Sequence, residues 1–158
     1  MKLDKSILAE IETAFGNVDR PELFTVADGD PETMDHEALL NSKNRETLTL
    51  EDVNRPGYNP MTECLPPGFA YYFPTLARLA LLHPTDPWYW YASVLLDKLR
   101  FYEHGNDFHR YCNGEQRSAI TSFLRHILDT RHSIVSASLD PDDFMHCYES
   151  WEAGRSVT

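Results

Sequence analysis

The segment from Glu63 to Tyr91 is the part of the chain most densely filled with large aromatic side chains. A folded chain must remove most of such a segment from water, so it predicts the centre of a core. Two consecutive prolines, Pro66 and Pro67, suit the first turn of a helix, where their missing amide protons do no harm. Pro74 lies inside that helix and predicts a kink or a break at Phe73. The apolar positions recur with a helical period: Phe69, Tyr72, Phe73, Leu76, Leu79 and Leu82.

Helix signals also occur along the rest of the chain. Residues 3–15 carry an apolar face with four-residue spacing, and Gly16 suits the left-handed position just past a helix end. Residues 87–103 predict a helix antiparallel to the preceding one. Asn113, with glutamine three positions later, predicts the start of the longest helix. An aspartate that accepts from free first-turn amides, followed by proline, marks three further starts: Asp30-Pro31, Asp86-Pro87 and Asp140-Pro141.

These signals predict a mostly α fold, a compact single-domain bundle of about five to six helices over residues 1–158. Residues 41–60 form a long acidic loop region with one turn around residues 49–53, and their order before binding is open. The longest helix is expected to direct Arg117, Arg125 and Arg131 outward. The last helix docks through Phe144, Tyr148 and Trp151. The predicted core contains Phe69, Phe73, Leu76, Leu95, Leu99, Phe123, Leu124 and Ile127.

The net charge of −11 is unevenly distributed. Residues 19–63 contain eleven acids against four bases, residues 64–139 six acids against seven bases, and residues 140–152 five acids without a base. This distribution disfavours nucleic acid and anionic membranes and favours a basic protein partner. The alternative is that the acids only keep the protein soluble. The acids predicted to bind the partner are Asp28, Asp30, Glu32, Asp142 and Asp143.

Three aromatic residues lie opposite the main apolar stripes and are predicted to be exposed anchors for a partner: Tyr71, Tyr89 and Trp90. The same side chains could join two copies of the chain, so the expected state is a monomer or a weak homodimer. The amino terminus lacks the apolar run of a signal peptide, and no segment reaches membrane-spanning length. Three widely spaced cysteines then predict reduced thiols in a cytoplasmic protein.

The nearest approach to a metal site is His104, His109 and Cys112, which are residue types that zinc binds. No fourth ligand is evident, so surface histidines beside a packed cysteine are the preferred interpretation. Cys64 precedes a helix start, but the neighbouring carboxylate of Glu63 opposes a lowered thiol pKa. None of the motifs of known hydrolases, nucleotide-binding proteins or metalloproteases occurs, so we expect no catalytic residue, no metal and no cofactor.

Four stretches together resemble an uncharacterised bacterial family, domain of unknown function 6714, over about residues 35–128. They are PPGFAYYFPTLARL, DPWYW, the Arg-Phe pair after a leucine-rich helix, and EQRSAITSFL. The resemblance implies a small helical bacterial domain and transfers no activity. Paired cysteines, frequent in that family ahead of this region, are reduced here to Cys64.

Two functional hypotheses follow. The first is a non-enzymatic protein-binding domain, an immunity or antitoxin-type protein that neutralises a basic toxin through an acidic face. The alternative is a small metal-binding or enzymatic module that uses His104, His109 and Cys112.

Overall fold

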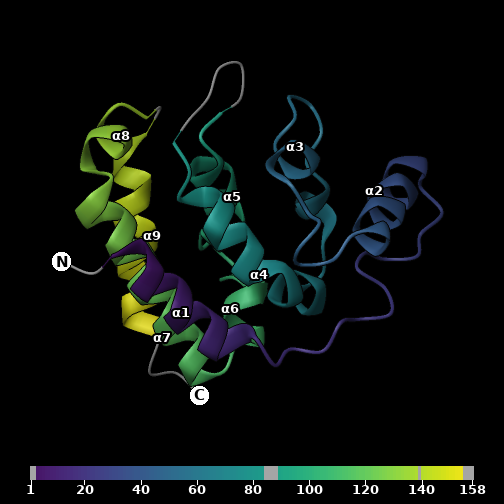
Figure 1. Ribbon diagram of the computed structural model, residues 1–158, viewed down its shortest axis with the longest axis horizontal. Helices are drawn as coiled ribbons and strands as arrows, with labels where there is room; N and C mark the ends of the chain where they lie inside the picture. Colours follow the sequence, from purple (N-terminus) through teal and green to yellow (C-terminus); the bar gives the residue numbers. More distant parts are fainter. Residues whose placement is uncertain (1–2, 84–88, 139, 155–158) are drawn as a thin grey trace.

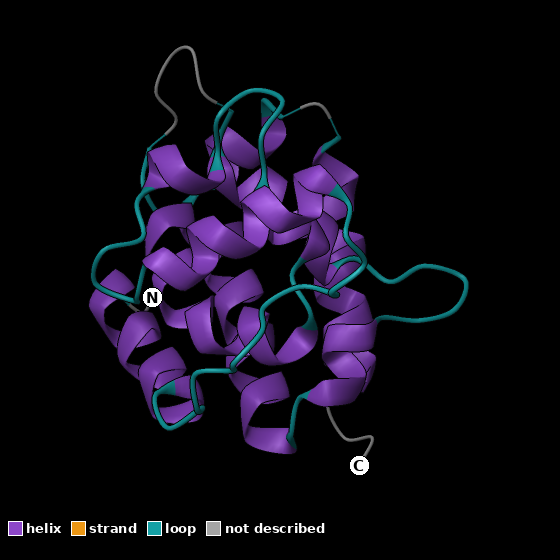
Figure 2. Ribbon diagram, turned by 90° about the vertical axis from the view of Figure 1, so that its right-hand side faces the viewer, coloured by secondary structure: helices purple, strands orange, loops and turns teal. Residues whose placement is uncertain are grey.

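The computed structural model describes residues 3–83, 89–138 and 140–154. Helices connected by loops make up this part of the chain, and it contains no strand (Figure 2). The prediction of a mostly α fold is confirmed, although the described helices outnumber the five to six expected. They are α1 (Asp4–Phe15), α2 (Pro31–Ser42), α3 (Leu50–Val53), the 3-10 helix η1 (Pro60–Glu63), α4 (Pro66–Ala80), α5 (Tyr91–Leu99), α6 (Asp107–Tyr111), α7 (Gly114–Thr130), α8 (His132–Ser136) and α9 (Pro141–Gly154).

The core forms where α4 meets α1, α6 and α7. Phe73 of α4 is fully buried, and its ring centroid lies 4.9 Å from that of Phe15 and 6.0 Å from that of Phe123. Phe108 of α6 closes this aromatic cluster, 4.5 Å from Phe69. The buried apolar side chains of all the described helices belong to one cluster. All eight predicted core residues are buried: Phe69, Phe73, Leu76, Leu95, Leu99, Phe123, Leu124 and Ile127.

Helix α4 passes through Pro74 without interruption, so of the predicted kink or break at Phe73 the break is wrong. A proline disturbs the carbonyls of the preceding turn, and here an outside donor reaches one of them. The Arg45 Nε donates to the Tyr71 carbonyl at 2.5 Å. The same guanidinium donates to the carbonyls of Gly16 and Phe15, both at 2.9 Å. Arg45 therefore supports α4 beside its proline and ties it to the end of α1.

Three of the predicted helix starts hold and one detail is wrong. Asp30 caps α2 by accepting from the Glu32 and Thr33 amides, and Asn113 and Gln116 form the predicted reciprocal cap of α7. Gly16 has a right-handed φ of −60°, not the left-handed conformation expected. Helix α9 begins at Pro141 as predicted, whereas the Asp86-Pro87 start lies outside the described residues. Helix α5 packs against α4 and is shorter than the predicted helix over residues 87–103.

The acidic region 41–60 contains the predicted turn as α3, which begins with a capping box between Thr49 and Asp52. Arg20, in the segment after α1, binds the carboxyl-terminal end of α2. Its guanidinium donates to the carbonyls of Asn41 at 2.8 Å and Lys43 at 2.9 Å. Helices α2 and α3 lie at one end of the long axis of the molecule, and α8 and α9 lie at the other (Figure 1).

Two arginines predicted to point outward are instead held inside the fold. Arg117 is buried, and its Nε donates to the His109 carbonyl at 2.9 Å. Arg131 binds both carboxylate oxygens of Asp4 in α1, at 2.6 and 2.7 Å, and also donates to the Leu81 carbonyl at 2.8 Å. The prediction was wrong because apolar periodicity does not show which carbonyl or carboxylate a long side chain will bind.

The Asp4 and Arg131 pair makes stability depend on pH. The hydrogen bond from Arg131 holds the pKa of Asp4 well below its usual range, with a further contribution from His126. A lowered folded-state pKa stabilises the fold above the ordinary carboxyl pKa of about 4, and this contribution is lost as pH falls through the folded value. We expect Asp4→Asn to lower the free energy of unfolding by about 1 kcal/mol at pH 7, since Asp4 is half-exposed. Urea unfolding should show the difference shrinking below pH 4. A constant difference down to pH 2 would contradict it, and Glu115→Gln serves as the exposed control.

Candidate functional site

Two hollows lie side by side on the surface and share Tyr89 and Val94 in their walls. The first, of about 330 Å³, lies between α2, η1 and the loop that joins α3 to η1, and we call it the His36 hollow. The second, of about 630 Å³, lies between α5 and the start of α9, and we call it the Trp90 hollow. We call the two hollows together the groove, which has α2 in the wall of one hollow and α9 in the wall of the other.

Tyr89 stands between the two hollows with 65 % of its surface exposed, as predicted for an anchor. Asn54, buried at the end of α3, donates from its side-chain nitrogen to the Tyr89 carbonyl at 2.6 Å. On the other side, the Trp90 indole donates to the Ala80 carbonyl at 3.0 Å and stacks on Phe144 at 5.4 Å. Both neighbours fix the backbone here, so Tyr89 is presented to solvent from a held position.

The other two predicted anchors are corrected by the structure. Trp90 is only 7 % exposed, because its ring fills the space between α5 and Phe144 and its indole nitrogen is bonded inside the fold. Tyr71 is half-buried beneath two guanidinium groups, those of Arg45 at 4.6 Å and Arg20 at 5.3 Å. It lines neither hollow. Both residues support the fold, and the predicted set of three anchors reduces to Tyr89 at this groove.

The structure separates the predicted partner-binding acids. Glu32 lines the His36 hollow, and Asp143 lines the Trp90 hollow, where it pairs with Arg100 at 2.5 Å. Asp28 and Asp30 are exposed and line neither hollow, and their carboxylates accept from backbone amides at the start of α2. Asp142 is exposed on α9 outside the groove. Helix α2, in the first acidic segment, and α9, which carries the second, lie at opposite ends of the long axis (Figure 1).

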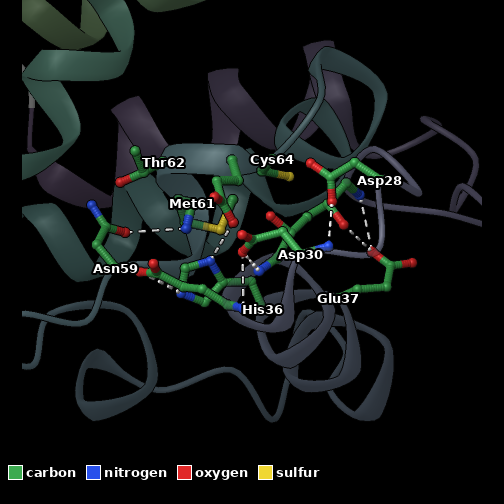
Figure 3. A network of polar contacts seen from close by, with 12 residues as sticks. Asp28, Asp30, His36, Glu37, Asn59, Met61, Thr62 and Cys64 are labelled. Atoms are coloured by element: carbon green, nitrogen blue, oxygen red, sulfur yellow. Dashed lines mark hydrogen bonds and ion pairs between the residues drawn. The ribbon is translucent and has the colours of Figure 1, made fainter.

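A histidine that the sequence analysis did not single out lies in the first hollow. The ring of His36 in α2 faces the η1 segment (Figure 3), and its Nδ1 lies 2.7 Å from Glu63 Oε2. Tyr58 packs edge-on against the imidazole with a centroid distance of 5.0 Å. No local pattern predicts this pair, because His36 and Glu63 are 27 positions apart.

The residues of the metal hypothesis do not converge. His104 is exposed and stacks on Tyr102. His109 is buried between Phe101 and Trp151, so the expectation that it is a surface histidine is wrong. Cys112 is buried and unbridged. Among the described residues, no three histidine, cysteine or acidic side chains are grouped so that they could hold a metal ion.

The cysteines are poor nucleophiles. Burial raises the pKa of the Cys64, Cys112 and Cys147 thiols to about 12, although Lys98 opposes the shift at Cys64. At neutral pH these groups are therefore protonated thiols inside the core.

Comparison with known proteins assigns no family and no function to the chain. No family model, curated protein or solved structure matches the chain. The resemblance to domain of unknown function 6714 thus stays a prediction, and the arguments below rest on the geometry. Within the described ranges, none of the helices is long and apolar enough to cross a bilayer.

Proposed function

We propose that the chain is a protein-binding domain without catalytic activity, of the immunity or antitoxin type, which neutralises a basic toxin by holding a segment of it in the groove. The observation that carries this proposal is the position of Tyr89. An exposed tyrosine held in place by its neighbours can bury a large contact area at little cost in conformational entropy. Tyr89 separates the two hollows, and each hollow can receive a side chain of the partner.

The charge around the groove supports a basic partner. Acidic side chains line both hollows and outnumber the arginines, which are Arg55 in the first and Arg100 in the second. Opposite charge at a rim accelerates association and orients the partner before contact. The acids concerned are Glu32, Glu63, Asp97, Asp140 and Asp143.

The alternative function, a metal-binding or enzymatic module, lacks comparable support. His104 is on the surface, His109 faces the ring of Trp151, and Cys112 is a buried thiol whose pKa is raised to about 12. Elemental analysis of the purified protein separates the two functions, since one equivalent of tightly held zinc would favour the module.

The test of the proposed function is the rate of association with a captured partner. Proteins retained from a lysate of the source organism would be identified, and their association would be followed by surface plasmon resonance at two salt concentrations. We expect a basic partner whose on-rate falls with ionic strength, because screening beyond about 8 to 10 Å removes long-range steering. Glu32→Lys combined with Asp97→Lys should lower the on-rate about tenfold at low salt, since both side chains are exposed in the groove.

The matched control is Asp19→Lys, an exposed acid that lines neither hollow. It should change the on-rate much less. If binding ignored both salt and the groove acids, the acidity would serve solubility alone and the proposed function would lose its main support.

A further inference from the structure

The His36 hollow contains a buried acceptor that the fold leaves unmatched. Only 3 % of the His36 side chain is exposed, and its Nδ1 is bonded to Glu63. Among the described residues, none lies within hydrogen-bonding distance of the opposite ring nitrogen, Nε2. Glu32 Oε1 lies 4.0 Å from Nε2, too far for a hydrogen bond, on a side chain that is 71 % exposed.

The partner of Nδ1 determines what Nε2 can do. An ionised carboxylate accepts hydrogen bonds and cannot donate, so the contact with Glu63 places the ring proton on Nδ1. In a neutral imidazole the lone pair then lies on Nε2, which is an acceptor. A buried acceptor without a donor is unfavourable, so a ligand that supplies an N–H group gains more here than at an exposed position.

The surroundings select a donor with positive charge. Glu32 and Glu63 contribute two carboxylates, and Tyr58 and Tyr89 contribute aromatic rings, against one basic side chain among the described lining residues, Arg55. The Arg55 guanidinium already lies 4.9 Å over the Tyr58 ring, so the rim of the hollow accommodates a cation on an aromatic face.

We propose that the His36 hollow receives the cationic N–H donor of a lysine or arginine side chain, with His36 Nε2 and the Glu32 carboxylate accepting from it. This inference rests on the proposed function and names the part of the partner that the groove recognises. Glu63 acts through His36 and is a positioning residue, because it fixes which ring nitrogen carries the proton.

Protonation of His36 competes with such a ligand, because the imidazolium would itself donate from Nε2 towards Glu32. The charged and titratable groups that face the ring are Glu32 on α2, Glu63 on η1, and Arg55 and Tyr58 on the connecting loop. Binding is therefore expected to weaken on acidification from pH 8 to pH 5.5, and the His36→Gln variant shows whether the histidine is responsible.

The test uses small probes on the whole protein. N-acetyl-arginine amide and N-acetyl-lysine amide are titrated at pH 8 into protein with nitrogen-15 in its histidines, and the His36 Nε2 resonance is followed by NMR. We expect one or both to shift this resonance with dissociation constants of about 1 to 10 mM, as suits so small a ligand. N-acetyl-citrulline amide, the neutral analogue of the arginine probe, should bind about tenfold more weakly. The difference between the arginine and lysine probes identifies the preferred cation.

Three further measurements make the result decisive. Acidification to pH 5.5 should weaken binding of the cationic probes about fivefold, and Glu32→Gln should weaken it at pH 8 about threefold. The His36→Gln variant should lose the pH dependence, and the wild-type pH profile carries the test if that variant does not fold.

Equal binding of the citrulline probe, or a His36 resonance unmoved by saturating cation, would overturn the inference. Those outcomes leave the proposed function standing if a basic partner still binds in a salt-dependent way. Conversely, probe binding at His36 without any basic partner would refute the proposed function and retain the cation site.

Discussion

Replacing Tyr89 with alanine should raise the dissociation rate of the bound partner about 30-fold and leave the fold unchanged. An exposed aromatic anchor at the centre of an interface contributes about 2 kcal/mol, and such losses show mainly in the off-rate. Tyr89 makes its backbone bond to Asn54 through its carbonyl, so the alanine variant keeps that contact. Surface plasmon resonance measures the rate directly, and circular dichroism confirms that the helices are retained.

Tyr111 provides the control for this experiment. It is also an exposed tyrosine, at the end of α6, and it lines neither hollow. Tyr111→Ala should change the dissociation rate less than twofold. If the partner dissociated faster from Tyr111→Ala than from Tyr89→Ala, the interface would lie elsewhere on the molecule.

Phe73→Ala should be among the most destabilising single substitutions in the chain. The ring is fully buried and packs against Phe15 at 4.9 Å and against both Phe69 and Phe108 at 5.9 Å. Removing a buried phenylalanine loses its transfer free energy and leaves a cavity, which together amount to about 3 to 5 kcal/mol. For a chain of this size the melting temperature should fall by roughly 10 °C. Urea unfolding followed by circular dichroism measures the free-energy change.

Leu82→Ala is the matched control, since Leu82 is a large apolar residue just past the end of α4 that is nearly half exposed. Its loss should change the free energy of unfolding by less than about 0.5 kcal/mol. If Phe73→Ala were as mild as Leu82→Ala, the aromatic cluster around Phe73 would not be the centre of the core.

Local chemistry in the sequence was sufficient to predict most of the fold. Helix α2 begins where Asp30 can accept first-turn amides, α7 begins at the reciprocal cap of Asn113, and helical periodicity placed the core positions. The errors arose where a distant group decides the local outcome. Arg45 lies 26 positions before Tyr71, whose carbonyl it binds, and no local rule shows that its guanidinium will support the helix beside Pro74. The short helices α6 and α8 were missed because five residues carry too little periodicity to recognise.

The candidate site was predictable only in part. The exposure of Tyr89 was predicted from the placement of the aromatic residues, and two of the acids predicted from the charge distribution, Glu32 and Asp143, line the hollows. Burial of Trp90 did not, because its indole finds the Ala80 carbonyl in the preceding helix. The pairing of His36 with Glu63 depends on how α2 packs on η1, which is a tertiary contact that a pattern within one segment does not contain.

The use of Arg20 and Arg45 inside the fold has a consequence for how fast and how selectively a partner is met. Both guanidinium groups donate to backbone carbonyls, and neither is paired with a carboxylate in the described structure. A basic partner that approaches Glu32 therefore does not have to displace an arginine of the chain itself from that carboxylate. Exchange of one salt bridge for another would slow docking and reduce the net gain from each new pair. Arg20 and Arg45 thus act as internal fasteners. Among the described residues Glu32 pairs with no arginine and is ready for a charge that comes from another molecule, whereas Asp97 and Asp143 are already paired with Arg100.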